Sequence, residues 1–491
     1  MCNVRRTTAM ITLLAAFYAG GCAHYPENPP LTAINRNAGY RYSVVREAPA
    51  ADRPFLLLSF SGGGTRAAAF AFGTMEELQR VEYADRGGVK RKLLDDVEII
   101  SSVSGGSFAS AYYALFPEDF FTQFPERFLY RDVQGALLLR LFNPYNWFRL
   151  ASPDFSRIDM AAEYYHETIF ERNTFADLAT RRRGSVPFIV LNATDIGIAH
   201  RFEFTQDQFD LLCSDLSGVP VSRAVAASSN FPVAFPPMTM TIHKRNCGPL
   251  PGWIDPALKD EGENRRKTDA RAALSYHAPD RLYAHLLDGG LSDNIGLRGP
   301  YQAVTTTDSA WSILAQTNRM RLERLMVISV NAKTTKHHDW DKKSNPPGIM
   351  EVLGVVTGGP MDDVSFDSIE MTDNHFSYMK QLSDTVHACN NLLKACPEIK
   401  PVRNPIPTAF TFSELSFDRI ADPRLRRCLQ ELPTSFDLPR ETVDLLRVSA
   451  AQLLMTSASF IKGMQDLDPA WMPRKVAMDE KLLDAVCGAQ R

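Results

Sequence analysis

The sequence predicts an α/β fold built on a mostly parallel sheet, and two observations carry this prediction. Nearly continuous apolar runs alternate with segments of helical spacing, and two of these runs end directly in glycine-rich turns. An apolar run without alternation is typical of a strand that is covered on both faces. Active sites in such sheets form at the carboxyl ends of strands, so we expect the two glycine-rich turns to lie there.

The strands and helices follow from these runs in order. The run PFLLLSF ends at Phe60, and residues 64–81 after it have helical spacing and strong helix formers. A second strand is predicted at 97–103, with a helix from about Gly105. Four later runs are also predicted as strands: VPFIVLNATDI, HRFEFTQDQF, RLYAHLLDGG and RLMVISVNAK. Beyond about Thr335 the pattern weakens, with an exposed loop at KTTKHHDWDKKSNPPG and a mainly helical remainder.

The composition is that of a globular protein. The chain has 491 residues, of which 45% are apolar and 23% charged, which is enough for one large core or for several smaller units. The net charge of -3 gives no reason to expect a nucleic-acid partner, because such partners need clustered Lys and Arg.

The first residues predict export. Arg5 and Arg6 precede an apolar stretch too short to span a bilayer, which indicates a signal peptide over residues 1–21. The sequence Ala-Gly-Gly-Cys that ends at Cys22 resembles the bacterial lipobox. This resemblance implies cleavage before Cys22, acylation of that residue and attachment to a membrane, with residues 22–50 as a tether. The expected location is the bacterial outer membrane or the periplasmic face, and a plain export signal is the alternative.

Export changes what the cysteines indicate. Six remain after Cys2 and Cys22 are set aside, and an even number is compatible with disulfides in an oxidising compartment. Sequence neighbours suggest three pairs, with buried free thiols as the alternative: Cys213 with Cys247, Cys389 with Cys396, and Cys428 with Cys487. No cysteine spacing resembles a zinc site.

Ser104 is the candidate nucleophile. It stands in Ser102-Val103-Ser104-Gly105-Gly106, which follows the pattern G-x-S-x-G with serine in the first position. Small residues on both sides allow a strained turn that exposes the hydroxyl between strand and helix. Ser107 is the rival in a shifted register, but it would lie inside the first helical turn.

Asp288 is the candidate base, because a serine hydroxyl is a weak nucleophile that needs one. It ends an apolar run and precedes two glycines, as an ordinary turn aspartate also would. His285 is near in sequence, but strand alternation places it on the opposite face. No histidine stands in a setting typical of a triad, which favours a Ser-Asp dyad.

The triple glycine Gly62-Gly63-Gly64 comes before a helix, so its free N–H groups can hold an anion. A nucleotide-binding turn is disfavoured, since no Lys-Ser/Thr follows the glycines. Together with Arg66, the serine turn and Asp288-Gly289-Gly290, this order of motifs resembles the patatin-like phospholipase family over roughly residues 55–333. Ala67 stands where the family commonly has glycine.

The resemblance implies a three-layer fold in which residues 51–335 form the catalytic domain and residues 336–491 a mainly helical extension. Ser104 would attack an acyl ester while Asp288 accepts its proton. Gly62, Gly63 and Gly64 would form the oxyanion hole, with Gly63 and Gly64 as the main donors, and no metal or cofactor would be needed. Arg66 would either hold the loop or contact a lipid phosphate. The segment VSRAVAASSNFPVAFPPM would shape the acyl pocket.

The predicted function is therefore that of an exported serine acyl hydrolase of the phospholipase A or lysophospholipase type, acting on lipid. Two alternatives remain: a non-catalytic envelope lipoprotein that uses the fold as a scaffold, and a Ser-His-Asp hydrolase. Residues 131–150 combine Leu, Phe, Tyr and Trp with three arginines. This composition suits either a surface that dips into lipid or a buried helix and loop.

Overall fold

The structure is a computed structural model of the chain. It describes most of the sequence in these ranges and positions: 23–46, 53–180, 186–232, 235–243, 247–305, 323–335, 339–342, 344–395, 398, 400–402 and 409–488. The signal peptide and Cys22 therefore lie outside the described residues.

The central sheet has the strand order β10-β9-β1-β4-β5-β8-β7, and β6 also pairs with β5. The pairs from β10 to β5 are parallel, whereas β6, β7 and β8 join in antiparallel fashion. Strands β2 and β3 form a separate small ribbon. The described strands are β1 (Phe55–Phe60), β2 (Glu82–Ala84), β3 (Lys90–Lys92), β4 (Val97–Val103), β5 (Phe188–Asp195), β6 (His200–Glu203), β7 (Met238–Thr241), β8 (Tyr283–Asp288), β9 (Arg324–Asn331) and β10 (Ala409–Ser416).

Helices surround this sheet. The helices before β9 are α2 (Tyr42–Val45), α3 (Gly64–Arg80), α4 (Gly105–Leu115), α5 (Phe120–Phe124), α6 (Val133–Phe142), α7 (Pro144–Leu150), α8 (Arg157–Thr168), α9 (Phe175–Thr180), α10 (Gln206–Leu211), α11 (Val221–Ser228), α12 (Ile254–Leu258), α13 (Arg265–Ser275), α14 (Gly290–Asp293) and α15 (Arg298–Thr305). The later ones are α17 (Ile349–Leu393), α18 (Pro423–Gln430), α19 (Arg440–Thr456), α20 (Ala458–Leu467) and α21 (Glu480–Cys487).

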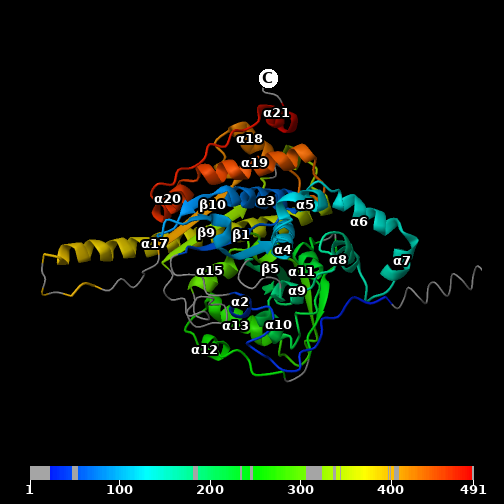
Figure 1. Cartoon of the computed structure of the whole chain (residues 1–491). Coiled ribbons are helices and arrows are strands. Elements are labelled where there is room, and N and C mark those ends of the chain that lie inside the picture. Colours follow the sequence, from blue (N-terminus) through cyan, green and yellow to red (C-terminus); the bar gives the residue numbers. More distant parts are fainter. Residues whose placement is uncertain are drawn as a thin grey trace, which may run out of the picture.

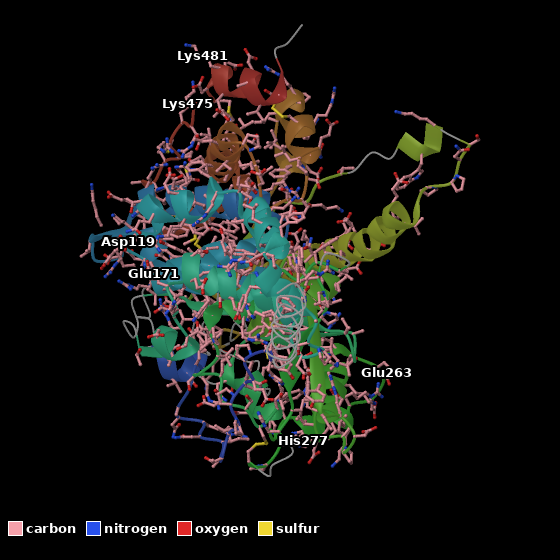
Figure 2. The ribbon with its side chains drawn as sticks, turned by 90° about the vertical axis from the view of Figure 1, so that its right-hand side faces the viewer. Asp119, Glu171, Glu263, His277, Lys475 and Lys481 are labelled. Carbon is pink, nitrogen blue, oxygen red and sulfur yellow. A yellow bond between two sulfur atoms is a disulfide. The ribbon has the colours of Figure 1, made fainter. Side chains whose placement is uncertain are left out.

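The molecule is layered. Figure 1 shows α18, α19 and α21 beyond α3 on one side of the sheet, and α9, α10, α12 and α13 on the other. In Figure 2, Lys475 and Lys481 lie at the end near α21 and His277 lies at the opposite end. All residues of β1 and β4 are buried. The predicted α/β fold with a mostly parallel sheet, flanking helices and a helical C-terminal region is confirmed.

The C-terminal region completes the same core. Strand β10 pairs with β9 along its whole length. Helix α19 packs on α3 so closely that a Cβ on Gly73 would lie 2.5 Å from the backbone of Arg447. Helix α19 therefore buries the outer face of α3. The domain boundary at residue 335 stays a prediction, but the two parts share one sheet.

Residues 23–46 correct the predicted tether. The Tyr25 amide donates to the Asp154 carbonyl, and the Leu31 amide donates to the Cys213 carbonyl. Tyr40 is buried, and buried Arg41 forms ion pairs with two aspartates of α10. This segment has large aromatic side chains besides its Pro and Asn, and their burial holds it on the domain.

Two of the suggested disulfides are present, Cys213–Cys247 and Cys428–Cys487. Cys389 has a free and exposed thiol, which corrects its suggested pairing, and Cys396 lies outside the described residues. Cys389 lies near the end of the long helix α17. None of the helices in the described ranges is both long and apolar enough to cross a bilayer.

The glycine-rich turns after β1 and β4 meet backbone to backbone. A Cβ on Gly105 would lie 2.0 Å from the carbonyl oxygen of Gly64, and one on Gly106 would lie 2.7 Å from the Cβ of Phe60. Neighbouring parallel strands bring the two turns together, because Phe60 is level with Ser102. The glycines are thus required by the close approach of two main chains.

We predict that Gly105→Ala lowers the free energy of unfolding by roughly 3 kcal/mol, because the new methyl group meets backbone that cannot move aside. Gly358→Ala in α17 is the matched control, since nothing lies within 4 Å of its added Cβ. It should leave stability unchanged or raise it slightly. Urea unfolding of the two variants measures this difference, and equal stability would contradict the account of the contact.

Candidate active site

Ser104 occupies a strained turn between β4 and α4. Its φ of 50° and ψ of -119° lie outside the regions that a residue with a side chain normally adopts. Strain of this kind typically costs about 1–3 kcal/mol and persists only where surrounding contacts impose it. The side chain of Ser104 lines a pocket of about 590 Å³ although the residue is largely buried. The predicted strand-turn-helix setting is confirmed.

The turn is held by Ser228 at the end of α11. The Ser104 amide donates to the Ser228 hydroxyl at 2.9 Å, and that hydroxyl donates to the Asn192 carbonyl of β5 at 2.6 Å. Since the Ser228 proton is used in this way, Ser107 donates its own proton to Ser228, at 2.9 Å. Ser107 is fully buried inside α4. Its hydroxyl therefore has a structural partner, whereas that of Ser104 faces the pocket.

Ser102 fits where the common pattern has glycine. Its hydroxyl lies 2.6 Å from that of Ser110 in α4, so the extra side chain makes a buried hydrogen bond between strand and helix. Ala67, the other departure, is buried within α3. Neither substitution places a side chain among the residues that line the pocket.

Asp288 reaches the site from an antiparallel strand. In the sheet, Val103 pairs with Asn192 on β5 and Ala193 pairs with Asp288 on β8, so Asp288 lies one row beyond Val103. That row is the level of Ser104. The prediction that Asp288 ends a strand is confirmed, but β8 runs opposite to β4, and its short overlap with β5 sets the height of the carboxylate.

The same end of α11 also holds Asp288. The Asp288 amide donates to the Asn230 carbonyl at 2.9 Å, and the Gly289 amide donates to the Ser228 carbonyl at 3.2 Å. Residues 228–230 thus hold the serine turn and the aspartate turn together. Sequence reasoning missed this role. The only signal was the segment VSRAVAASSNF, which was expected to shape the acyl pocket and does contribute Phe231 to the pocket lining.

Burial dominates the electrostatics of Asp288. It raises the pKa of the carboxyl from 3.8 to about 6, against smaller lowering contributions from hydrogen bonds of the Gly290 amide and the Ser104 hydroxyl. The Gly290 amide donates to Oδ1 at 2.8 Å. A carboxylate with a pKa near 6 is a better proton acceptor than an ordinary aspartate, and it is still mostly ionised at pH 7.

The triple-glycine turn lies against Ser104. A Cβ on Gly62 would be 3.2 Å from the Cβ of Ser104. The Gly62 amide donates to the Asn294 carbonyl at 2.9 Å, and the Thr65 amide donates to the Ser435 carbonyl. Gly63 and Gly64 lie between these two residues. Within the part of the chain that the structure describes, neither of their amides has an acceptor. Gly63 and Gly64 are therefore the two free donors of this turn, and Gly62 is committed to Asn294.

Arg66 is buried behind this turn and holds a loop. Its guanidinium donates to the carbonyls of Ala332, Leu432 and Pro433, and to the Thr434 hydroxyl. These acceptors are neutral, and burial lowers the pKa of Arg66 to about 10. A Cβ on Gly63 would lie 2.9 Å from its Nη2. Of the two predicted roles, the contacts of Arg66 match that of holding the loop, and its charge lies beside the free amides.

The pocket in front of these groups has mixed polarity. Its other lining residues come largely from α17 and from the segment predicted as an exposed loop, and they include Lys333, Thr335, Trp340, Glu351, Val355, Met361 and Asp362. None of the lining residues within the described ranges is a histidine. His285 points to the exposed face of β8, as predicted, while Asp288 is buried. Among the described residues, no group of His, Cys, Asp or Glu could hold a metal ion.

Residues 58–301 match the family model described as patatin-like phospholipase. Residues 58–301 therefore form a patatin-like phospholipase domain, which contains Gly62, Ser104 and Asp288. A search of curated protein sequences found no match.

Solved structures of two proteins are among those that resemble the chain at low identity. Human GIVD cytosolic phospholipase A2 has 15% identity and a TM-score of 0.31, with 58% of this chain and 44% of that chain covered. In complex with methyl gamma-linolenyl fluorophosphonate, the same human protein has 12% identity and a TM-score of 0.41, covering 86% and 60%. VipD from Legionella pneumophila has 11% identity and a TM-score of 0.26, covering 86% and 70%. The chain thus spans about half the length of the human structures.

We predict that Asp288→Asn stabilises the protein at pH 7. The folded pKa of about 6 exceeds the ordinary 3.8, so the folded state favours the protonated form, and the ionised carboxylate costs stability that grows as the pH rises above 3.8 and is fully expressed above about pH 6. Removing the charge should raise the free energy of unfolding by roughly 3 kcal/mol at pH 7 and by about half of that at pH 5. Urea unfolding of the wild type and the variant at both pH values measures the difference in the free energy of unfolding. A destabilised variant, or a gain that grows toward pH 5, would contradict the burial argument.

Proposed function

We propose that this protein is a serine acyl hydrolase of the phospholipase A or lysophospholipase type, and that it cleaves lipid acyl esters with Ser104 and Asp288 as a catalytic dyad. One observation carries the proposal. A hydroxyl on a strained turn, a buried carboxylate and Gly63, whose amide is free, line one pocket in a chain with a patatin-like phospholipase domain, and the free amide of Gly64 follows directly.

In the first half of the reaction, Asp288 accepts the proton of the Ser104 hydroxyl while the oxygen attacks the ester carbonyl. The carbonyl oxygen becomes an oxyanion, which accepts hydrogen bonds from the amides of Gly63 and Gly64. The buried charge of Arg66 adds to the positive potential at this point. The tetrahedral intermediate then expels the alcohol, Asp288 returns the proton to it, and the acyl group remains on Ser104.

In the second half, water replaces the alcohol. Asp288 accepts a proton from the water as it attacks the acyl-serine ester, and the same two amides hold the second oxyanion. The Ser104–acyl bond breaks, the proton passes to the serine oxygen, and the fatty acid leaves. Asp288 is thus ionised at the start of each half-reaction.

We further propose that the protein is exported and anchored through an acylated Cys22, at the bacterial outer membrane or the periplasmic face. Two disulfides support an oxidising compartment. The first residues fit a lipoprotein signal. Mass spectrometry of the purified protein tests this proposal, because an N-terminal diacylglyceryl cysteine at position 22 is expected.

We predict that purified protein releases fatty acids from a mixed bacterial lipid extract. Ser104→Ala and Asp288→Asn should each reduce release by about 1,000-fold or more, because each removes a group that acts in both half-reactions. Liquid chromatography with mass spectrometry measures the fatty acids. The double variant His337→Ala with His338→Ala tests for a Ser-His-Asp triad, because these two histidines lie outside the described residues. This variant should keep the activity of the wild type.

Each contrary outcome has a distinct meaning. Equal release by the wild type and both site variants would end the dyad assignment. A loss of release in the histidine variant would indicate a Ser-His-Asp hydrolase. No release by any form, with all forms folded, would favour the non-catalytic scaffold.

We predict an acid limb with an apparent pKa of about 6 in kcat/KM, because Asp288 must be ionised to accept a proton and burial raises its pKa to about 6. Activity should be near its maximum at pH 7 and fall tenfold per pH unit well below pH 6. Asp96 is the matched control, since burial also raises its pKa to about 6 while it lies at the start of β4, away from Ser104. The variant Asp96→Asn should show the same fall of kcat/KM at acid pH. If this fall disappears in Asp96→Asn, the assignment of the pKa to Asp288 is contradicted.

A further inference from the structure

The helices α6 and α7 carry a cluster of exposed large apolar side chains. We define the α6–α7 patch as Leu138, Leu139, Phe142, Tyr145 and Trp147, which are all exposed. Leu139 and Phe142 are each 73% exposed. The pair of helices projects from one side of the molecule, opposite to the long helix α17 (Figure 1). So many exposed apolar side chains on two short consecutive helices mark an interaction surface.

The polar groups beneath the patch are satisfied internally. Trp147 donates its ring N–H to the Leu141 carbonyl at 2.5 Å, and Asn146 donates to the Arg140 carbonyl at 2.8 Å. The Asn143 side chain accepts from the Tyr145 amide at 3.0 Å. The carbonyls of Arg140 and Leu141 near the end of α6 and the indole N–H therefore have partners within the protein. An exposed turn with satisfied polar groups can enter an apolar medium without losing hydrogen bonds.

The charges in this region face the protein. Between Val133 and Leu150 the sequence has no Asp, Glu or Lys and only two arginines. Arg140 pairs with Glu167 and Arg149 pairs with Glu163, both on α8. The guanidinium of Arg140 also lies over the ring of Tyr164. These two arginines hold the helices on α8, and the guanidinium of the exposed Arg131, which precedes α6, also lies over the ring of Tyr164, so the patch itself presents apolar and aromatic groups.

The N-terminal end of the described chain lies beside the patch. The Ser152 hydroxyl, two residues after α7, donates to the Ala23 carbonyl at 2.5 Å, and the Tyr25 amide donates to the Asp154 carbonyl at 2.7 Å. Twenty-two residues precede Ala23, and their sequence has the features of an export and acylation signal. The chain enters the folded body next to α7.

The other end of the patch connects to the catalytic turn. At the start of α6, the Val133 amide donates to the Phe436 carbonyl at 3.2 Å. The neighbouring Ser435 carbonyl accepts from the Thr65 amide, directly after the triple glycine. The segment 435–436 therefore links the α6–α7 helices to the turn that bears the free amides.

From these contacts we infer that the α6–α7 patch is the face with which this protein inserts into a lipid surface, and that insertion depends on its apolar side chains rather than on charge. Trp and Tyr are the aromatic residues that membrane interfaces favour. Because both arginines are engaged, docking requires no anionic lipid and resists salt. The inference concerns binding only, and it holds whether or not Ser104 is catalytic.

The test uses full-length protein with Ser104→Ala, so that no lipid can be hydrolysed, and phosphatidylcholine vesicles with brominated acyl chains. The emission of Trp147 is obtained as the difference between this protein and the same protein with Trp147→Phe. We expect brominated chains to quench about half or more of that emission. Quenching should be the same at about 0.1 M and 0.5 M NaCl and should not increase with added phosphatidylglycerol.

A matched control separates insertion from mere proximity to the vesicle. Tyr378 is 61% exposed and belongs to α17, the helix that projects on the opposite side of the molecule (Figure 1). Tyr378→Trp in the Trp147→Phe background should show no quenching. Leu139→Ser with Phe142→Ser should abolish the quenching of Trp147 while thermal unfolding shows that the fold is kept.

Three results would overturn the inference. The first is an unquenched Trp147 on vesicle-bound protein, which would show that the patch faces away from lipid. The second is quenching that needs phosphatidylglycerol or disappears in salt, which would show electrostatic docking. The third is a dimer in analytical ultracentrifugation that the double serine variant disperses, which would show that the patch joins two copies of this chain.

Discussion

The end of α11 is the point on which the site depends. The Ser228 side chain holds the Ser104 amide, the Ser228 carbonyl accepts from the Gly289 amide, and the Asn230 carbonyl accepts from the Asp288 amide. Two turns that are 184 residues apart are thus fixed to three consecutive residues. A strained serine keeps its conformation only when its surroundings impose it, and these bonds supply that requirement. The Asp288 carboxylate and the Ser104 hydroxyl lie within hydrogen-bond reach because both turns are bonded to the end of α11.

The same geometry explains why the site has an energetic cost. Burial raises the pKa of Asp288 because it withholds water from the carboxylate, and no cation in the described part of the chain compensates for this. Arg66 is buried nearby, but its donors are used by neutral carbonyls and a hydroxyl. Among the described residues, the buried anion of Asp288 and the buried cation of Arg66 therefore pair neither with each other nor with another charge, and Arg66 lies beside the free amide of Gly63. Such an arrangement destabilises the fold and suits a transition state in which charge moves between those groups.

The sequence predicted the parts of the site that depend on local pattern. Apolar runs, glycine-rich turns and helical spacing predicted β1, β4, α3 and α4, and the small residues around Ser104 predicted the strained turn. The position of Asp288 could not follow from the same rule. The rule concerns parallel strands, whereas β8 is antiparallel and reaches the site through its register with β5. Register between distant strands is set by tertiary packing, which no single segment reveals.

Two further features had no clear signal in the sequence. The segment 23–46 has the composition of a tether, but the burial of aromatic residues such as Tyr40 fixes it to the domain. In the sequence, Ser228 looks like an ordinary serine at the end of a helix. Its importance lies in its hydrogen-bond partners, which come from the turn after β4, from β5 and from the turn after β8. Both cases show that composition describes a segment alone, whereas its role depends on what the rest of the chain brings to it.

The central claim is that Asp288 activates Ser104, and covalent labelling tests it most directly. An organophosphonate reagent should modify one residue, Ser104, identified by peptide mass spectrometry, and the labelling rate should fall by half near pH 6. Asp288→Asn should label at least about 100-fold more slowly at pH 7. Modification of Ser107 instead, or a rate at Ser104 that is unchanged by Asp288→Asn, would contradict the account.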